Sequence, residues 1–198
     1  MAVKIKSISS DVLKTISFSN AEDWNKWLDK HHQTSPGIWI RFFKKNSGIS
    51  SISHAEALDE ALCYGWIDGQ LKKFDDNSWL QKFTARRTKS IWSKKNTLRA
   101  EQLIKLNKMK TAGLKEINNA KKDGRWTKAY DSPGNMNIPD DFLEKLSKDK
   151  KALKFFNTLN RVNKYAISWR LQTAKKPETR LKRMDNILDM LSKGEKFH

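Results

Sequence analysis

ALCYGWIDGQ, residues 61–70, carries the change from helix to strand on which the fold depends. Just before it, SHAE at 53–56 has the Ser-x-x-Glu spacing of a capping box, which predicts a helix start. The apolar positions of that helix fall on one side and are Leu58, Ala61 and Leu62. Gly65 stands where a glycine in the left-handed conformation ends a helix. We therefore expect a helix after Ser53, a stop at Gly65 and a strand that begins at Trp66.

Three strands are predicted around this stop. WIDGQLKKF (66–74) and SWLQKFTAR (78–86) flank DDNS (75–78), a composition typical of a tight turn. IWIRFF (38–43) is rich in β-branched and aromatic residues and follows a Pro-Gly break. We expect an antiparallel hairpin that joins the earlier strand in a small sheet.

The rest of the chain is predicted to be helical. SNAE (19–22) suggests Ser19 as the cap of a first helix, and Ser93 is the expected cap of a helix over 93–109. A further helix is expected within AGLKEINNAKKDGRW (112–126). The expected apolar faces are Trp24, Trp27, Leu28 and His31 in the first helix, then Leu159, Val162, Ala166, Trp169 and Thr173, and finally Leu181, Met184, Leu188 and Leu191.

These elements predict an α+β fold in two domains. Residues 1–130 would form an α+β domain with a small antiparallel sheet and several helices. The segment 131–141, with its Pro, Gly and Asn residues, is the predicted linker, and 142–198 would form a small helical domain.

The charge of the chain is strongly uneven. It has 198 residues and a net charge of +18, yet residues 1–81 hold ten basic and ten acidic side chains. Residues 82–130 hold fifteen basic side chains against three acidic ones, and 142–198 hold fifteen against six. The excess favours an anionic partner, although a solvated lysine-rich surface has the same composition.

Composition also bears on the cellular location of the protein. No apolar run approaches the roughly 20 residues of a membrane-spanning helix, so membrane insertion is not expected. A single cysteine cannot form an internal disulfide, and the first residues lack the pattern of a secretory signal. We expect a cytoplasmic protein.

Two motifs resemble a known family. ALCYGWIDG, followed by FTARRTKSIWSKKN at 83–96, is similar to the paired signature of the YdeI/OmpD-associated, or bacteriocin-protection, family. AGLKEINNAKKDGRW, IPDDFLEKL and AKKPETRLKR extend the resemblance over about residues 15–195. Ala85 departs from it, because the family pattern has proline there. The resemblance implies an association with resistance to bacteriocins and cationic antimicrobial peptides, and it implies no particular reaction.

Trp66, Asp68 and Arg86 form the first group of candidate ligand-binding residues. Trp66 and Asp68 share one face of their strand, and an acid covered by an indole needs a partner. Arg86, at the end of the next strand, could form a structural ion pair with Asp68. Alternatively, the three side chains could face a ligand, since an arginine fork suits carboxylates and phosphates.

Ser90, Trp92, Ser93 and Asn96 form the second group. Ser93 and Asn96 are explained by helix capping alone. A basic helix start with free amides, hydroxyls and an indole is also an anion-binding arrangement. Both interpretations stay open.

Signatures of catalysis are weak. Cys63 lies at a predicted helix end, where the helix dipole disfavours a thiolate, so we expect a buried core residue. The four histidines lack zinc-site spacing, and there is no phosphate-binding glycine loop; we expect neither a metal nor a cofactor.

The leading hypothesis is a noncatalytic binding protein for an anionic small molecule or an acidic protein partner. The alternative is a nucleic-acid-binding protein that uses the basic surface of residues 82–198, although no recognition signature is present. A third hypothesis is an enzyme in which folding brings a histidine to Cys63.

Overall fold

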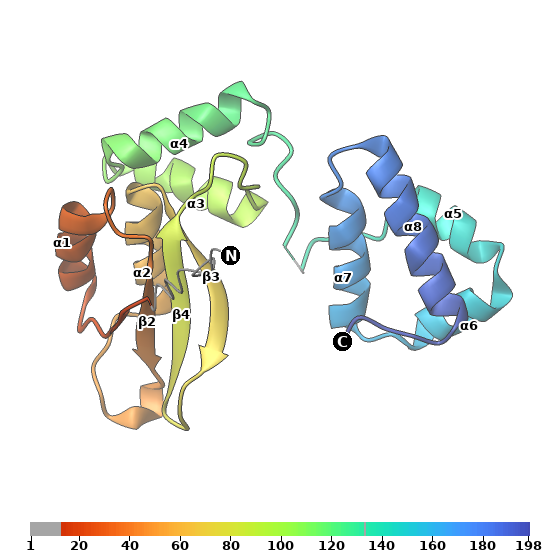
Figure 1. Ribbon diagram of the computed structural model, residues 1–198, viewed down its shortest axis with the longest axis horizontal. Coiled ribbons are helices and arrows are strands. Elements are labelled where there is room, and N and C mark those ends of the chain that lie inside the picture. The colour runs from red at the N-terminus through yellow and green to blue at the C-terminus, as the bar shows by residue number, and fades with distance from the viewer. Residues whose placement is uncertain (1–12, 133) are drawn as a thin grey trace, which may run out of the picture. The chain divides into compact units, whose positions relative to one another are not determined.

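The computed structural model of the protein describes residues 13–132 and 134–198. In chain order the elements are β1 (Thr15–Ile16), α1 (Ala21–His31), β2 (Ile38–Phe43), the short 3-10 helix η1 (Lys45–Ser47), α2 (His54–Cys63), β3 (Trp66–Lys73), β4 (Ser78–Ala85), α3 (Lys94–Lys105), α4 (Thr111–Lys122), α5 (Asp140–Ser147), α6 (Lys150–Thr158), α7 (Arg161–Gln172) and α8 (Pro177–Ser192). All the strands come early, and every element after β4 is a helix (Figure 1). The predicted α+β class is confirmed.

The strands form one sheet in the order β1-β2-β4-β3 (Figure 1). β2 and β3 both pair antiparallel with β4, which confirms the predicted hairpin and its earlier neighbour. The two-residue strand β1 runs parallel to β2 and was not predicted. Between Asp68 and Leu71 the register shifts, so β3 carries a bulge.

One face of the sheet is covered by α1 and α2. Trp24 of α1 packs edge-on against Trp66 and Phe83, with ring centroids 6.3 Å and 5.7 Å apart. On α2, the ring of His54 lies 6.0 Å from that of Phe42. The strand residues of this core are at most 1% exposed and comprise Ile38, Ile40, Phe42, Trp66 and Phe83. Large aromatic side chains therefore supply much of the buried apolar area.

The helix stop in ALCYGWIDGQ is confirmed. α2 begins after a complete capping box between Ser53 and Glu56 and ends at Cys63. Gly65 has φ +73°, and its amide donates to the Leu62 carbonyl at 3.1 Å. The amide of Arg86 donates to the Gly65 carbonyl at 2.9 Å, which aligns the start of β3 with the end of β4.

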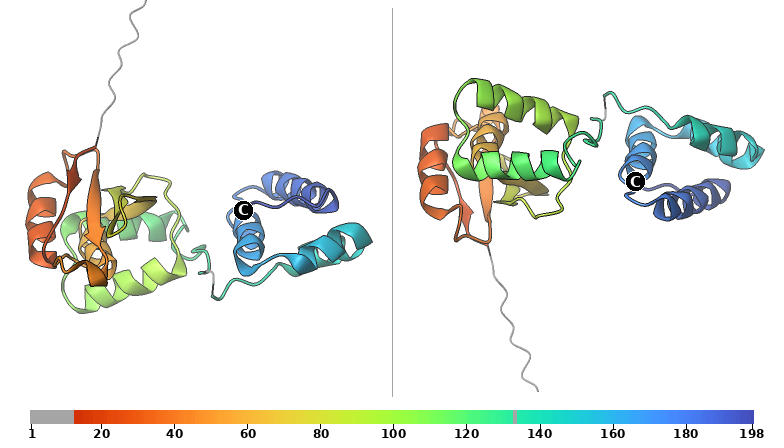
Figure 2. Two further views of the ribbon diagram at one scale, coloured as in Figure 1. Left: turned by 90° about the horizontal axis from the view of Figure 1, so that it is seen from below. Right: turned by 90° about the horizontal axis from the view of Figure 1, so that it is seen from above.

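α3 and α4 lie side by side at one end of the sheet (Figure 1, Figure 2). α4 approaches the end of α2 closely at Gly113. A Cβ atom at that position would collide with the carbonyl oxygens of Cys63 and Leu62. Glycine is therefore required where the two helices meet.

The described chain divides into two compact units. The first runs to Ser90 and includes Leu98–Gly124, and the second comprises Ile91–Thr97 and Arg125–His198. Tyr130 explains why the short segment belongs to the second unit: its amide donates to the Trp92 carbonyl at 3.0 Å, and its carbonyl accepts from the Lys94 amide at 2.8 Å. The predicted linker at 131–141 stays a prediction.

The second unit has its own core, built by α5 to α8. The buried side chains that form it are Phe142, Leu146, Ala152, Phe156, Leu159, Ile167, Leu171, Met184, Ile187 and Leu191. None of the helices in the described residues combines the length and apolar character that crossing a membrane requires.

Several local predictions are wrong in detail. The cap of α1 is Asn20, whose side chain accepts from the Asp23 amide at 2.9 Å, and Ser19 has no such role. In α1, Trp24 and Leu28 are buried but His31 is exposed.

The predicted apolar faces of the last two helices also need correction. Leu159 is buried, but it is the C-terminal cap of α6 and lies outside α7. Val162 and Leu181 are 59% and 50% exposed. The buried side chains of α7 are Asn163, Ala166, Ile167, Ser168 and Leu171. Because this buried face includes the polar residue Asn163, its apolar periodicity is interrupted and the face was not predicted.

Candidate functional site

Trp66 belongs to the core of the first unit. Its side chain is 0% exposed, and its indole N–H donates to the His32 carbonyl at 3.0 Å. Its ring also meets Trp27 edge-on, with centroids 5.8 Å apart. The ring is thus enclosed by protein and its polar atom is satisfied.

Asp68 and Arg86 lie at the same end of the β3–β4 hairpin. Asp68 accepts from the ring nitrogen Nε2 of His54 at 3.1 Å, a contact between β3 and α2 that was not predicted. The Asp68 side chain is 27% exposed, whereas Arg86 is 7% exposed as a residue. The ion pair of Asp68 with Arg86, and its ligand-facing alternative, stay predictions.

Ser90, Trp92, Ser93 and Asn96 fall on both sides of the division between the units. Ser90 belongs to the first unit with Trp66, Asp68 and Arg86, and the other three belong to the second. Ser93 accepts from the Asn96 amide at 3.2 Å at the start of α3, as predicted for a cap. Trp92 is 2% exposed and its ring lies 4.8 Å from that of Trp126.

Cys63 is 1% exposed, as expected for a core residue. Burial raises the pKa of its thiol to about 12, and the nearby carboxylates Glu60 and Asp59 add to the shift. A thiolate is therefore disfavoured at neutral pH, which removes the property that a cysteine nucleophile needs.

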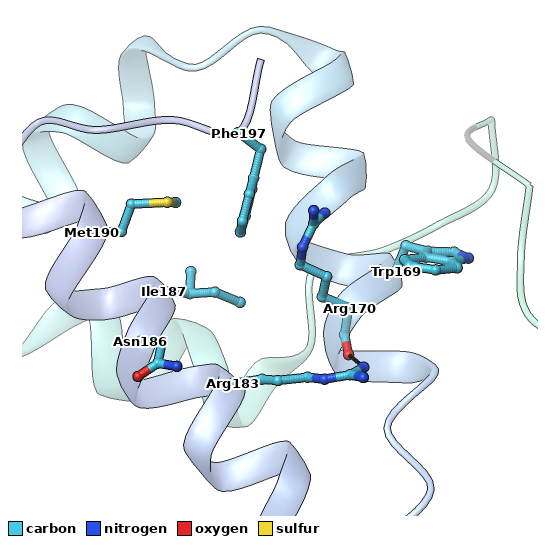
Figure 3. Close-up of a pocket in the computed structure, with 7 residues that line it drawn as sticks. All are labelled: Trp169, Arg170, Arg183, Asn186, Ile187, Met190 and Phe197. Atoms are coloured by element: carbon cyan, nitrogen blue, oxygen red, sulfur yellow. Dashed lines mark hydrogen bonds between the residues drawn. The ribbon is translucent and has the colours of Figure 1, made fainter. Parts of the chain in front are cut away.

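A cavity of about 350 Å³ opens in the second unit (Figure 3). α7 contributes two of its lining residues, α8 contributes four, and the last comes from the segment after α8. They are Trp169, Arg170, Arg183, Asn186, Ile187, Met190 and Phe197. Ile187 is 2% exposed and belongs to the core, so the cavity has an apolar wall as well as polar groups.

Two arginines give this cavity its charge. The guanidinium carbon of Arg170 lies 3.7 Å from the centroid of the Phe197 ring. Arg183 reaches across from α8 and donates from Nη1 to the Arg170 carbonyl at 2.7 Å (Figure 3). No carboxylate of the described residues lies within 4.0 Å of either guanidinium; the acids of α8 that form ion pairs there, Asp185 and Asp189, bind lysines instead.

The segment after α8 is held in place by Asn163 of α7. This side chain is 1% exposed, donates to the His198 carbonyl at 3.2 Å and accepts from the His198 amide at 3.0 Å. The two hydrogen bonds fix the backbone next to Phe197. They explain how a residue outside the helices comes to line the cavity.

The arrangement is suited to binding an anion that carries an apolar part. Guanidinium groups donate paired hydrogen bonds to carboxylates and phosphates, and the apolar wall accommodates the rest of such a ligand. No group of three or more His, Cys, Asp or Glu in the described chain is placed to hold a metal ion.

This cavity was not predicted from the sequence. Arg183, Asn186, Ile187 and Met190 stand at spacings of three, one and three, which put them on one side of a helix. That side mixes charge, amide and apolar residues, so a search for purely apolar faces passes over it. Arg170 comes from another helix and enters only through the fold.

Comparison with known proteins matches two separate segments of the chain to two different family models. Residues 135–194 match the family model described as "Bacteriocin-protection, YdeI or OmpD-Associated". The segment 135–194 belongs to the YdeI/OmpD-associated family. Residues 16–116, half of the chain, match a second family model, described as "Domain of unknown function (DUF8412)". The chain belongs to that family as well. No curated protein and no solved structure matches the chain.

The predicted family is therefore confirmed, with a difference in where its evidence lies. The motifs ALCYGWIDG and FTARRTKSIWSKKN fall within 16–116, the part described as a domain of unknown function. The YdeI/OmpD-associated match covers α5 to α8 and every residue of the Arg170–Arg183 cavity except Phe197. The candidate site thus lies in the part of the chain that carries the family description.

Proposed function

We propose that this member of the YdeI/OmpD-associated family is a noncatalytic protein that binds a small anionic ligand in the Arg170–Arg183 cavity. The observation that carries the proposal is the pair of guanidiniums lining one cavity without a carboxylate partner in the described chain. Positive side chains that no carboxylate neutralises favour the binding of an anion.

The ligand has a carboxylate or phosphate head and an apolar body. The head would accept hydrogen bonds from the guanidiniums, and the body would contact Ile187, Met190 and Phe197. A volume of about 350 Å³ lies at the lower end of the range for small-molecule sites, so a compact ligand is favoured.

This site replaces Trp66 and Trp92 as the centre of the binding hypothesis. Both tryptophans are at most 2% exposed, so their rings would have to leave the core to reach a ligand. Cys63 is a poor candidate for a catalytic nucleophile because its thiol pKa is raised to about 12, so a binding role is favoured over a catalytic one. A cytoplasmic location is part of the proposal.

The experiment is a thermal-shift titration of the full chain. Benzoate, phenyl phosphate and inorganic phosphate are compared at constant ionic strength, with sodium chloride as the reference salt. A ligand that binds only the folded state stabilises it by RT ln(1 + [L]/Kd), about 2.7 kcal/mol at a hundredfold excess over Kd. We expect benzoate or phenyl phosphate to stabilise the protein beyond the chloride reference.

Two charge variants on the same helix locate the effect. Arg183→Gln should abolish the ligand-induced shift, and Lys182→Gln should retain it, because Lys182 is exposed and does not line the cavity. Equal loss in both variants would reduce the effect to general charge. The absence of any shift beyond chloride would overturn the proposal.

A further inference from the structure

The face of the sheet opposite α1 and α2 carries a different set of side chains. Strand register places Trp39 beside Lys82, and Arg41 beside Leu80, which in turn lies beside Lys72. Because side chains alternate along a strand, these residues share the face opposite the core residues Ile38, Ile40 and Phe83. We call Trp39, Arg41, Lys72, Phe74 and Lys82 the open-face cluster; Phe74 joins it through Arg41.

Aromatic and basic groups alternate in the open-face cluster. The Lys72 ammonium lies 4.4 Å from the centroid of the Trp39 ring. The Arg41 guanidinium lies 4.5 Å from the Phe74 ring, which is on a residue 52% exposed. Each aromatic ring thus already has a cation over its face. A nucleic-acid base could stack on the ring in place of that cation, and the displaced cation could then bind a phosphate.

In this part of the chain, acidic and basic side chains lie on different surfaces. Residues 1–81 are neutral in sum, but the described acids among them lie in α1, in α2, in the β3–β4 turn and, for Asp68, on the covered face. None lies in a strand on the open face. Arg41 is bound by Asp75 at 2.6 Å, whereas Lys72 and Lys82 form no ion pair with a described residue.

We propose that the open-face cluster binds single-stranded nucleic acid. A single strand offers both groups that the surface fits: planar bases for Trp39 and Phe74, and phosphates for Lys72 and Lys82. Proteins that bind single strands combine stacking aromatic side chains with basic ones in this way. A duplex hides its base faces, and an acidic peptide has no comparable planar group to place on both rings.

This surface is separate from the cavity of the proposed function. It lies in the first unit, whereas Arg170 and Arg183 lie in the second, so either proposal can fail without the other. It also differs from the basic surface of residues 82–198, because four of its five residues precede residue 82.

The test uses the full chain and fluorescein-labelled oligo-dT and oligo-U, with fluorescence anisotropy at several salt concentrations. We expect binding at about 50 mM salt that weakens as salt rises, because phosphate neutralisation releases counterions. Trp39→Ala should weaken binding about tenfold or more through lost stacking, and Trp39→Phe should keep most of the affinity. If Trp39→Ala fails to fold, Trp39→Leu keeps apolar bulk without an aromatic face.

Matched lysine variants separate the surface from general charge. Lys72→Ala/Lys82→Ala should lower the slope of log affinity against log salt by about 1.4, or about 0.7 for each lost phosphate contact. Lys115→Ala/Lys122→Ala removes the same charge from exposed positions of α4, outside the open-face cluster, and should leave the slope nearly unchanged.

Three results would overturn the proposal. The first is no binding at about 50 mM salt. The second is equal loss in the two lysine pairs, which would indicate a general cationic effect. The third is equal affinity for duplex DNA or an acidic polypeptide together with an unchanged Trp39→Ala variant, which would indicate a polyanion surface without base stacking.

Discussion

Gly65 decides where α2 stops and where β3 begins. Its φ of +73° is a conformation that costs a residue with a Cβ atom about 1–2 kcal/mol. A Cβ there would also lie 3.0 Å from the Ala112 carbonyl oxygen, so α4 adds a steric demand. Gly65→Ala should therefore lower the free energy of unfolding by more than the conformational cost alone.

Gly48 is the matched control for that prediction. Its φ is +71°, but a Cβ atom there would meet nothing within 4 Å. Chemical denaturation should show that Gly48→Ala costs about 1 kcal/mol and that Gly65→Ala costs clearly more. Equal losses would mean that α4 yields to the new methyl group.

Cys63 predicts a pH dependence at the same scale. Burial raises its thiol pKa from the ordinary 9.0 to about 12, so the unfolded chain releases this proton at lower pH than the folded chain. The stability tied to the protonated thiol is complete below about pH 9 and is lost as pH rises towards 12. The free energy of unfolding of the wild type, minus that of Cys63→Ala, should fall across this window.

Denaturant titrations of both proteins at several pH values measure this difference. Tyr64, whose pKa is also raised to about 12, is common to the two chains, so the larger part of its contribution, which comes from burial and Asp29, cancels in the comparison; the smaller part that comes from the Cys63 thiolate belongs to the measured difference. In a companion measurement, iodoacetamide should modify Cys63 only when denaturant is present. A constant difference, together with rapid alkylation of the native protein, would contradict the buried assignment.

At the scale of elements, the start of α1 gives a prediction about two neighbouring residues. Asn20 caps the helix through the Asp23 amide at 2.9 Å, and Ser19 is exposed. Asn20→Ala should cost about 1 kcal/mol, and Ser19→Ala should stay within about 0.5 kcal/mol of wild type. Thermal denaturation of the two variants checks this. A larger loss for Ser19→Ala would restore the cap that the sequence pattern favoured.

Elements with a strong local signal were predictable from the sequence. The helix stop at Gly65, the capping box of α2 and the β3–β4 hairpin all depend on residues close together in the chain. β1 was missed because two residues carry no periodicity, and its parallel pairing with β2 depends on the folded sheet. The cap at α1 was missed because two residues capable of capping stand side by side.

The candidate site was less predictable than the fold, because its residues meet only through packing. Arg170 and Arg183 come from different helices, and Phe197 is placed by the Asn163–His198 hydrogen bonds. Trp66 and Trp92 drew attention as motif residues, yet both are buried in their own units. A motif marks positions that matter to a family without separating a core role from a binding role.

At the scale of the whole molecule, the net charge of +18 bears on the family's link to bacteriocin protection. Like charges repel over about 30 Å at 0.01 M salt, so direct capture of a cationic peptide is opposed before contact. We infer that any protection is indirect. In fluorescence anisotropy at about 0.01 M salt, a labelled lysine-rich amphipathic peptide should not bind, whereas a glutamate-rich peptide of equal length should bind and dissociate by about 0.15 M. Saturable binding of the lysine-rich peptide at both salt concentrations would show that local contacts overcome the repulsion, and it would make direct capture the better explanation.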